Sequence, residues 1–477
     1  MPTLKTVAST PLLRQSAVEI EMSGANVNTA SQRHRSLCRA AFALSVIAWL
    51  APAPGAAQAP TVCGTGAPDS WIAACGTIID NARESIQNRV RALKFRGLAH
   101  YRGGDIERAA ADFTAATTLA PDDPEGWIDL GMMRQTRGDF DGAIADYDKA
   151  VALDPASWVA HVNRGNALRL KSDPAGAIAE YNVALGLKPD LNSALRGRGM
   201  ARQMQGDLAG AIADATSALQ LEPRDAEALI DRGNAFRRLG NADKALADYE
   251  AATTAAPDHA GAWLDRGALL MQQGSIDAAI ASFDKTIALN PRSVEGYNNR
   301  GTAESQNGDF ARAAADLDTA VRLGPGYEGA YGNRGFVRLA LGDFAGAAAD
   351  FDALASREPG DPYRVLWRHL ARMRTGMADD GFAREAAALG TGPWPGPLLA
   401  LFAGSLDREK IMAMAAEVDP AQRAERRCEI VFYVGEYALT KDDRATAAPL
   451  LREAAASCPV GFLERVGAMG ELKRLQP

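Results

Sequence analysis

Residues 124–157 read PEGWIDLGMMRQTRGDFDGAIADYDKAVALDPAS, and this stretch decides the fold because its pattern recurs along the chain. Glycines recur every 34 residues from Gly97 to Gly335, and alanines keep the same step from Ala109 to Ala347. Prolines follow the same step at positions 121, 155, 189, 223, 257, 291, 325 and 359. A fixed period of this length is the signature of a tandem repeat. The sequence therefore predicts eight repeats over residues 90–361.

Each repeat is predicted to form a hairpin of two helices. Apolar residues have helical spacing from Trp127 to Arg137 and again from Phe140 to Leu153, with Gly138-Asp139 between the two stretches. Small residues at the glycine and alanine positions let the helices approach closely. Large residues fill the space between neighbouring repeats, at Phe113, Tyr147, Tyr181, Tyr249, Phe283 and Phe351. The predicted fold is an all-α, right-handed superhelical solenoid with helical caps.

The repeat resembles the tetratricopeptide repeat family. That family has a large residue, then Leu-Gly, then a later alanine, aromatic residue, alanine and proline. The second repeat matches this pattern at Trp127, Leu130, Gly131, Ala143, Tyr147, Ala150 and Pro155. The resemblance implies a solenoid whose first helices line a concave, partner-binding face.

One departure from the family pattern is systematic. Arginine replaces the usual leucine before the glycine, at Arg96, Arg164, Arg198, Arg232, Arg266, Arg300 and Arg334. An acid recurs on the second helix, at Asp112, Asp146, Glu180, Asp214, Asp248, Asp316 and Asp350. One interpretation makes these arginines a ligand-binding row. We expect the other, in which each guanidinium pairs with a carboxylate on an adjoining helix, because an unpaired buried charge is costly.

The resemblance also implies a binding groove, because the second, fifth, sixth, ninth, twelfth and thirteenth positions of each family repeat point inward. These positions predict a central groove of Arg169, Arg196, Met200, Gln203, Ile230, Asn234, Arg237, Arg238, Leu264 and Met271. Its arginines suit an acidic segment or a free carboxylate. The competing interpretation is a solvated face without a dedicated ligand. No carboxylate clamp is predicted, since only Asn166 and Asn234 fit that pattern loosely.

The first 59 residues have the order of a secretory signal peptide. Arginines within residues 33–39 precede an apolar run over residues 40–51, and the small-residue motif Ala57-Gln58-Ala59 follows. The apolar run is short for a membrane-spanning helix, and a permanent anchor is the competing interpretation. We expect cleavage after Ala59, a true start at Met22, and a periplasmic or secreted protein of Gram-negative type with no transmembrane anchor.

The cysteines predict two disulfides. The four that remain after cleavage are Cys63, Cys75, Cys428 and Cys458, an even number for an oxidising compartment. The first two belong to the leader and to residues 69–83, which are expected to form a capping helix. The last two stand at the first and thirty-first positions of a restored ninth hairpin, which brings them together. Free buried thiols are the competing interpretation.

The predicted organisation has six parts. They are a signal peptide (1–59), an amino-terminal capping segment (60–89), eight repeats (90–361), an irregular helical connector (362–427), a ninth hairpin (428–461) and a capping helix (462–477). The last part of the chain, at residues 361–367, 398–406, 432–437, 462–464 and 471–472, is similar to the tail of the NlpI family of periplasmic repeat lipoproteins. This similarity implies an adaptor that binds a carboxy-terminal processing protease and peptidoglycan hydrolases, although the chain lacks the lipid-anchor cysteine.

Composition and motifs narrow the function classes. The net charge is -7, which gives no electrostatic case for nucleic acid. The five histidines lie far apart, and no phosphate loop, nucleophile elbow or metal-ligand cluster is present in the sequence. We expect no catalysis, no cofactor and no metal. Two functions remain: an exported adaptor that binds partner proteins or extended peptides, and a structural scaffold for envelope polysaccharide or cell-wall assembly.

Overall fold

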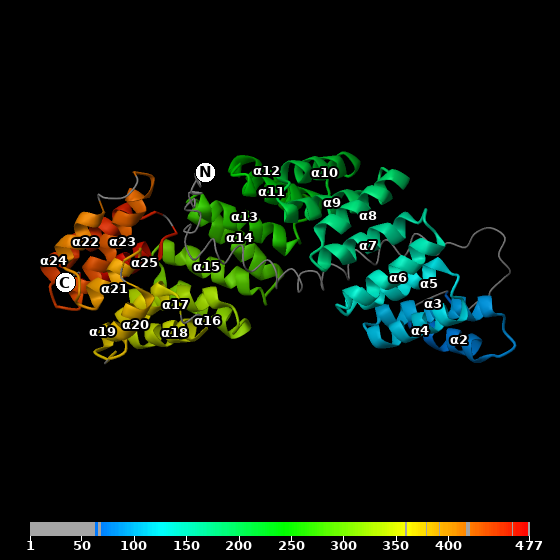
Figure 1. The fold of residues 1–477 in the computed structure, drawn as a ribbon, viewed down its shortest axis with the longest axis horizontal. Coiled ribbons are helices and arrows are strands. Elements are labelled where there is room, and N and C mark those ends of the chain that lie inside the picture. Colours follow the sequence, from blue (N-terminus) through cyan, green and yellow to red (C-terminus); the bar gives the residue numbers. More distant parts are fainter. Residues whose placement is uncertain are drawn as a thin grey trace, which may run out of the picture. The chain divides into compact units, whose positions relative to one another are not determined.

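The computed structural model describes residues 63–64, 68–357, 360–377, 379–390, 392–415, 420–459 and 461–475. These residues form helices and contain no strand (Figure 1). They divide into two compact units, an N-terminal unit that ends at Ala255 and a C-terminal unit that begins at Ala256. The predicted signal peptide and its cleavage site lie outside the described residues. None of the described helices has the length and apolar character needed to cross a membrane.

The N-terminal unit is a row of helical hairpins behind a capping helix, α2 (Pro68–Asp80). The first helices of its five repeats are α3 (Ile86–Arg102), α5 (Pro124–Thr136), α7 (Trp158–Leu170), α9 (Asn192–Gln205) and α11 (Ala226–Arg238). The second helices are α4 (Ile106–Leu119), α6 (Phe140–Leu153), α8 (Pro174–Leu187), α10 (Leu208–Leu221) and α12 (Ala242–Ala255). Each helix packs mainly against its neighbours in sequence, as a solenoid requires. The all-α repeat fold predicted from the period is confirmed.

Local chemistry fixes where the hairpins turn. Gly138 has φ of 84°, in the left-handed region that a side chain disfavours. Asp139 then caps α6, because its Oδ1 accepts a hydrogen bond of 2.9 Å from the Gly142 amide. Asp105, Asp173 and Asp207 cap α4, α8 and α10 in the same way.

The two helices of a hairpin are close because glycine faces an aromatic ring. A Cβ added to Gly131 would lie 2.6 Å from Cε1 of Tyr147, and one added to Gly233 would lie 2.8 Å from Cε1 of Tyr249. Both tyrosine side chains are fully buried. Any larger residue at these glycines would push the two helices of the hairpin apart. The close approach predicted from the sequence is therefore present.

The arginine row is structural, as we expected. Arg232 donates from Nε and Nη2 to both carboxylate oxygens of Asp248, at 2.9 and 2.7 Å. Carboxylates of the same repeat bind the guanidinium groups of Arg96, Arg164, Arg198, Arg300 and Arg334 in the corresponding place. In the sixth repeat Ser282 stands in place of the recurring acid, and Arg266 donates to its hydroxyl at 2.8 Å.

Several of these arginines also join successive repeats. Arg300 binds Asp316 on its own second helix, α16 (Phe310–Leu323), and donates from Nη1 to Asp284 on the preceding second helix, α14 (Ile276–Leu289), at 2.6 Å. Arg334 bridges Asp350 and Asp318 likewise. The row therefore holds neighbouring hairpins in register.

A disulfide closes the amino-terminal cap. The Sγ atoms of Cys63 and Cys75 are 2.08 Å apart, so the predicted pair is confirmed. Trp71 of α2 packs edge-on against Phe95 of α3, with 5.6 Å between ring centroids. The cap thereby covers apolar residues of α3 that have no preceding repeat to bury them.

The C-terminal unit continues the hairpins and then folds back. Its repeats contain α13 (Ala260–Gln272), α14, α15 (Val294–Gln306), α16, α17 (Glu328–Leu341) and α18 (Phe344–Arg357). The connector forms α19 (Pro362–Thr375), α20 (Phe382–Leu389), α21 (Gly396–Phe402) and α22 (Arg408–Met414). The last elements are α23 (Pro420–Leu439), α24 (Arg444–Ser457) and α25 (Leu463–Leu475).

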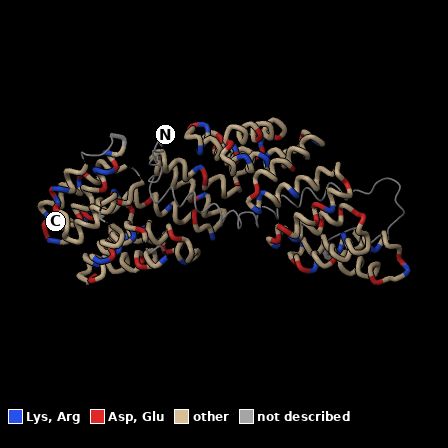
Figure 2. Tube along the Cα trace, in the orientation of Figure 1, with Lys and Arg blue, Asp and Glu red and all other residues tan. Residues whose placement is uncertain are grey.

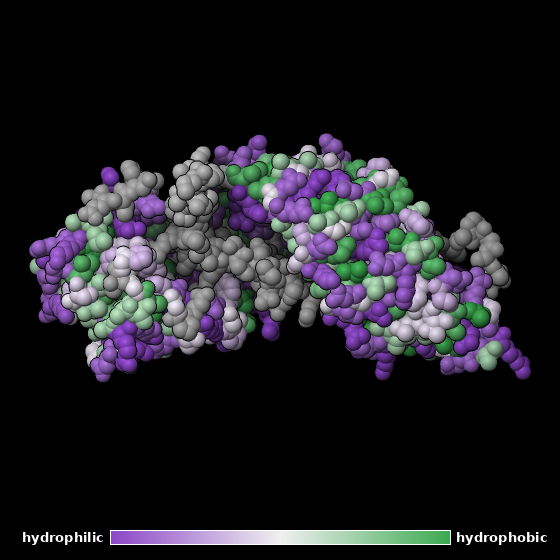
Figure 3. Space-filling model, viewed as in Figure 1, coloured by the Kyte–Doolittle hydropathy of each residue, from purple (hydrophilic) through white to green (hydrophobic). Residues whose placement is uncertain are grey.

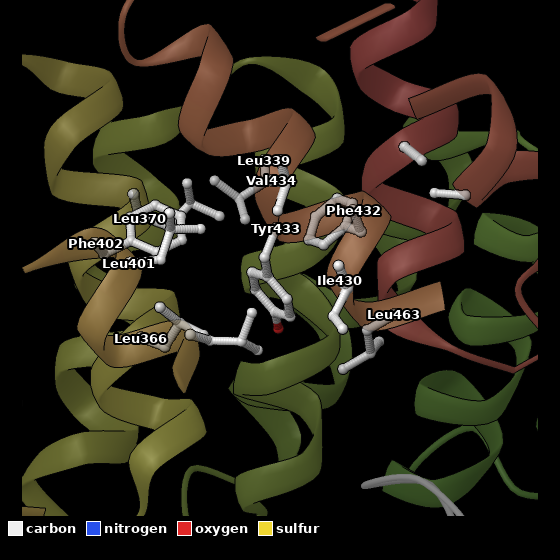
Figure 4. Packing of buried hydrophobic residues seen from close by; sticks show 14 of the residues in the cluster. Leu339, Leu366, Leu370, Leu401, Phe402, Ile430, Phe432, Tyr433, Val434 and Leu463 are labelled. Atoms are coloured by element: carbon white, nitrogen blue, oxygen red, sulfur yellow. The ribbon is translucent and has the colours of Figure 1, made fainter. Parts of the chain in front are cut away.

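The main core of the C-terminal unit lies where these last elements meet the repeats. Figure 4 shows Leu366 and Leu370 of α19 with Phe432 and Tyr433 of α23, all almost completely buried. Cys428 and Cys458 join α23 to the end of α24, with Sγ atoms 2.08 Å apart, which confirms the second predicted pair.

Helix α25 returns to the repeats and packs against α17 and α24. Lys473 Nζ donates to the Gly308 carbonyl at 2.7 Å, and Arg474 donates to the Ala340 carbonyl. Glu471 accepts from Arg374 of α19 at 2.8 Å. The end of the chain therefore ties the connector to the last repeats.

Candidate partner-binding face

The predicted groove residues of the N-terminal unit lie on its first helices. We call the side of α3, α5, α7, α9 and α11 that carries the inward repeat positions the first-helix face. First helices contact one another directly along this side, as α7 does with α9 and α9 with α11. Among the described residues of this unit, no other helix packs across it. Figure 2 shows charged residues of both signs along these helices.

Arg196 does not stand alone on this face. Its Nε donates to Asp231 at 3.1 Å, its Nη2 donates to Glu227 at 3.3 Å, and Asp225 lies 3.9 Å away. All three acids belong to α11 or to its N-cap. The sequence predicts Arg196 as a cation for an acidic partner. In the structure three carboxylates of this chain already surround its guanidinium.

Burial shapes the electrostatics of this group. Burial raises the pKa of Asp231 to about 6, although the charge of Arg196 opposes that shift. Burial also opposes the charge on Arg196, but Asp231, Asp225 and Glu227 together raise the pKa of its guanidinium. The arginine is held charged, and the Asp231 carboxyl is harder to ionise than it would be in water.

A second contact joins α9 to α11 nearer their ends. Gln203 Nε2 donates to the Asp231 carbonyl at 3.0 Å, and Arg238 Nη1 donates to the Gln203 carbonyl at 2.7 Å. Arg238 remains exposed. Both predicted groove residues therefore also serve the packing of successive first helices.

Two predicted groove residues contact the buried tyrosines. The Tyr249 hydroxyl donates to Asn234 Oδ1 at 2.8 Å, as the Tyr181 hydroxyl does to Asn166 Oδ1 at 2.7 Å. Burial raises the pKa of Tyr181, and the neighbouring Arg169 opposes the rise through its charge and a hydrogen bond. Arg169 and Asn234 thus lie on the first-helix face and also contact the tyrosines that pack the hairpins.

Arg237 differs from the other arginines of the predicted groove. Its half-buried side chain makes no ion pair and no hydrogen bond to any residue in the described ranges. Met200 is also half-buried, whereas Ile230 is buried. Leu264 and Met271 lie on α13 of the C-terminal unit and are buried there. The structure brings together only the eight groove residues from Arg169 to Arg238 within one unit.

The sequence reasoning missed the acids on this face. The predicted groove omits Glu227 and Asp231, although they occupy the inward second and sixth positions of the fifth repeat, and it omits Asp225, which ends the fourth repeat. The sequence does contain a signal for these acids, because the same pattern of one cation and three acids occurs three repeats earlier. There it consists of Lys94, Asp123, Glu125 and Asp129.

The described part of the chain contains no cluster of side chains suited to bind a metal ion. Within the described ranges, no group of three or more His, Cys, Asp or Glu side chains is arranged to hold a metal ion. His161 binds Glu180 at 2.7 Å and the Pro155 carbonyl at 3.2 Å. His369 binds Asp379 at 2.9 Å and stacks on Phe382. Both histidines have structural neighbours.

Solved structures of other proteins are similar to parts of this chain. The protein MamA is 26% identical over 34% of this chain and 95% of its own, with a TM-score of 0.31. PilF of Pseudomonas aeruginosa is 20% identical over 43% of this chain and 92% of its own, with a TM-score of 0.39. A tetratricopeptide repeat protein from Parabacteroides merdae is 24% identical over 52% of this chain and 98% of its own, with a TM-score of 0.41. No curated protein matches the chain.

A family model decides the classification. The model described as "Tetratricopeptide repeat" matches residues 80–124, 128–192, 196–260, 230–294 and 298–362, which together make up more than half of the chain. These ranges contain the hairpins, the glycine–aromatic contacts and the arginine row described above. The chain belongs to the tetratricopeptide repeat family.

Proposed function

We propose that this protein is an exported, non-enzymatic adaptor that holds partner proteins on the first-helix face of its N-terminal unit. The observation that carries this proposal is the row of five neighbouring first helices that no other described helix of the unit covers. Such a face offers an extended partner contacts to several repeats at once. In the view of Figure 3, hydrophilic and apolar residues are mixed on this unit.

Export is part of the proposal and rests on the sequence. The arginines, the apolar run and Ala57-Gln58-Ala59 support a cleaved leader. Two disulfides suit an oxidising compartment. We expect the mature chain to begin at Pro60, and amino-terminal sequencing of the purified protein tests this. A cytoplasmic protein that begins at Met1 or Met22 would contradict export.

The partner class comes from the similarity of the last part of the chain to the NlpI tail. It makes a carboxy-terminal processing protease or a peptidoglycan hydrolase the first candidate. Affinity capture with the tagged mature protein from envelope extract, with cross-linking, tests the proposal. A protease or hydrolase in the eluate supports the adaptor, whereas polysaccharide or cell-wall synthesis machinery supports the scaffold alternative.

The capture needs a matched variant, and Arg237 provides one because its side chain makes no ion pair to a described residue. A protein that binds wild type and the Arg237→Ala, Arg238→Ala variant equally would not use this end of the face. Recovery of no protein above background from several growth conditions would count against the adaptor function itself.

A further inference from the structure

We propose that the first-helix face of the N-terminal unit docks a partner segment that carries two cationic side chains, one for each of two matching charge clusters. The proposal rests on the adaptor function and names the chemistry of its partner. Cluster one consists of Lys94, Asp123, Glu125 and Asp129. Cluster two consists of Arg196, Asp225, Glu227 and Asp231.

The two clusters have the same construction. In cluster one, Lys94 Nζ lies 2.7 Å from Glu125 and 3.3 Å from Asp123. Asp129 has the largest charge effect on Lys94, and it raises the pKa of the ammonium against the opposing effect of burial. In cluster two, Arg196 has the corresponding three acids around it. Each cluster therefore contains three carboxylates around one cation.

The solenoid does not need these charges. Each cluster uses the fifth and last positions of one repeat and the second and sixth of the next. The other five junctions between the eight repeats have at most one formally charged residue at these four positions. The junction from Ile128 to Asn163, for example, has only uncharged residues there. Packing of first helices is thus achieved without the clusters, which occur twice on one unit.

The clusters are also unfavourable for the chain by themselves. Burial raises the pKa of Asp129 to about 7 and that of Asp231 to about 6, so each carboxylate is ionised at a cost. Carboxyl groups whose pKa is raised in this way cluster at functional sites. A cation from outside would lower that cost, whereas an anionic segment would raise it.

The remaining side chains make a polypeptide cation the fitting occupant. Glu125 has a 60% exposed side chain, so a partner residue can reach cluster one from solvent. Beside cluster two, the half-buried Met200 lies one turn beyond Arg196 on α9 and adds an apolar side chain to the face. A Lys or Arg side chain combines an apolar stem with a charged end and matches both features.

The spacing of the clusters sets the spacing of the cations. Packed helices lie about 8–10 Å apart, so the three steps from one cluster to the other span roughly 24–30 Å. An extended segment rises about 3.3 Å per residue. Two cationic residues about eight positions apart would therefore reach both clusters.

The test uses the full mature chain and fluorescent peptides built on a neutral Ser/Thr/Ala backbone. The first peptide has two lysines about eight positions apart, the second has them adjacent, and the third has glutamates in their place. The protein variant is Asp123→Asn with Asp225→Asn, which removes one charge from each cluster. Asparagine keeps the helix caps that both aspartates provide.

The chain offers a matched control for this variant. Asp361 has the same repeat position and caps α19, but Gly332 stands where the clusters have Lys94 or Arg196. Asp361→Asn should therefore leave peptide binding unchanged. Glu125→Gln gives a second reduction of charge in cluster one at an exposed site that does not endanger folding.

We expect wild type to bind the first peptide at least tenfold more tightly than the double variant binds it. We also expect wild type to bind the first peptide at least tenfold more tightly than it binds the adjacent-lysine peptide or the glutamate peptide. The affinity for the first peptide should fall with added salt. Equal affinity for wild type and the double variant, tighter binding of the glutamate peptide, or no saturable binding below about 1 mM would each overturn the proposal. A captured partner that binds the double variant as well as wild type would overturn it and leave the adaptor function intact.

Discussion

Asp248→Ala is the most informative single change in the arginine row, because Asp248 forms one isolated pair. Arg232 is bound to both of its carboxylate oxygens, and its Nη1 has only a long contact of 3.4 Å to the Thr216 hydroxyl. The side chains are 24% exposed for Arg232 and 8% exposed for Asp248. Removing one partner of a buried pair costs about 3–5 kcal/mol, because the other is left uncompensated.

The exposed fractions of the Arg232 and Asp248 side chains decide how much of this free-energy cost each variant shows. Arg232 can still reach water when Asp248 is removed, so we expect Asp248→Ala to lower the local free energy of unfolding by about 2–3 kcal/mol. Arg232→Leu leaves the more deeply buried Asp248 alone, and we expect about 3–4 kcal/mol. The double variant Arg232→Leu, Asp248→Ala leaves neither charge and should cost less than the sum of the two single changes.

The chain supplies its own control for the pair. The sixth repeat has Ser282 where Asp248 stands, and Arg266 donates to that hydroxyl. Asp248→Ser should keep a neutral acceptor for Arg232 and cost about 1 kcal/mol, well below Asp248→Ala.

Hydrogen exchange is the appropriate assay, since a solenoid opens locally and its unfolding is not a single two-state event. Amides of α11 and α12 in Asp248→Ala should exchange about 30- to 140-fold faster than in wild type, while those of α15 and α16 stay unchanged. Changes below about 0.5 kcal/mol in all three single variants would refute the reasoning and show that the pair behaves as an exposed ion pair.

Three further predictions concern the disulfide, the pH dependence and the binding face. Cys428→Ser with Cys458→Ser should lower the stability of the C-terminal unit by about 3–4 kcal/mol, from a loop with a sequence separation of 30; peptide mapping of the exported protein that finds four free thiols would contradict the pairing. Burial, with the charge of Glu471 beside it, raises the pKa of Glu436 from 4.5 to about 8 against the opposing charges of Arg374 and Arg474. The folded chain then binds this proton more tightly than the unfolded chain, so stability should fall as pH rises from about 4.5 to 8. Glu436→Gln should flatten that decline in denaturant titrations, and a steeper decline would be inconsistent with the assignment. Arg237→Ala with Arg238→Ala removes two positive charges from α11, the helix that carries Glu227 and Asp231, so a partner held on this face through cationic side chains should bind unchanged or more tightly; a loss of affinity of tenfold or more, about 1.4 kcal/mol, would show instead that the partner meets these arginines with carboxylates.

The period of the sequence determined most of the repeat structure. Because each repeat contacts only its neighbours, a pattern of 34 residues defines both the helices and their partners. Gly131 predicted the close approach of Tyr147, and the recurring arginines predicted carboxylate partners that the structure confirms. The cysteine pairs could be predicted for the same reason, because their positions within a hairpin or a cap already bring them together.

Contacts outside the period were decided only by the tertiary structure. The return of α25 to α17 joins Arg474 to Ala340 across a separation of 134 residues, which no local pattern encodes. The acids around Arg196 come from the next repeat, so a position-by-position interpretation treated that arginine as a free cation. Charge is the reason for the difference: apolar spacing identifies a buried face within one helix, whereas the net charge at a point is the sum over side chains that only folding brings together.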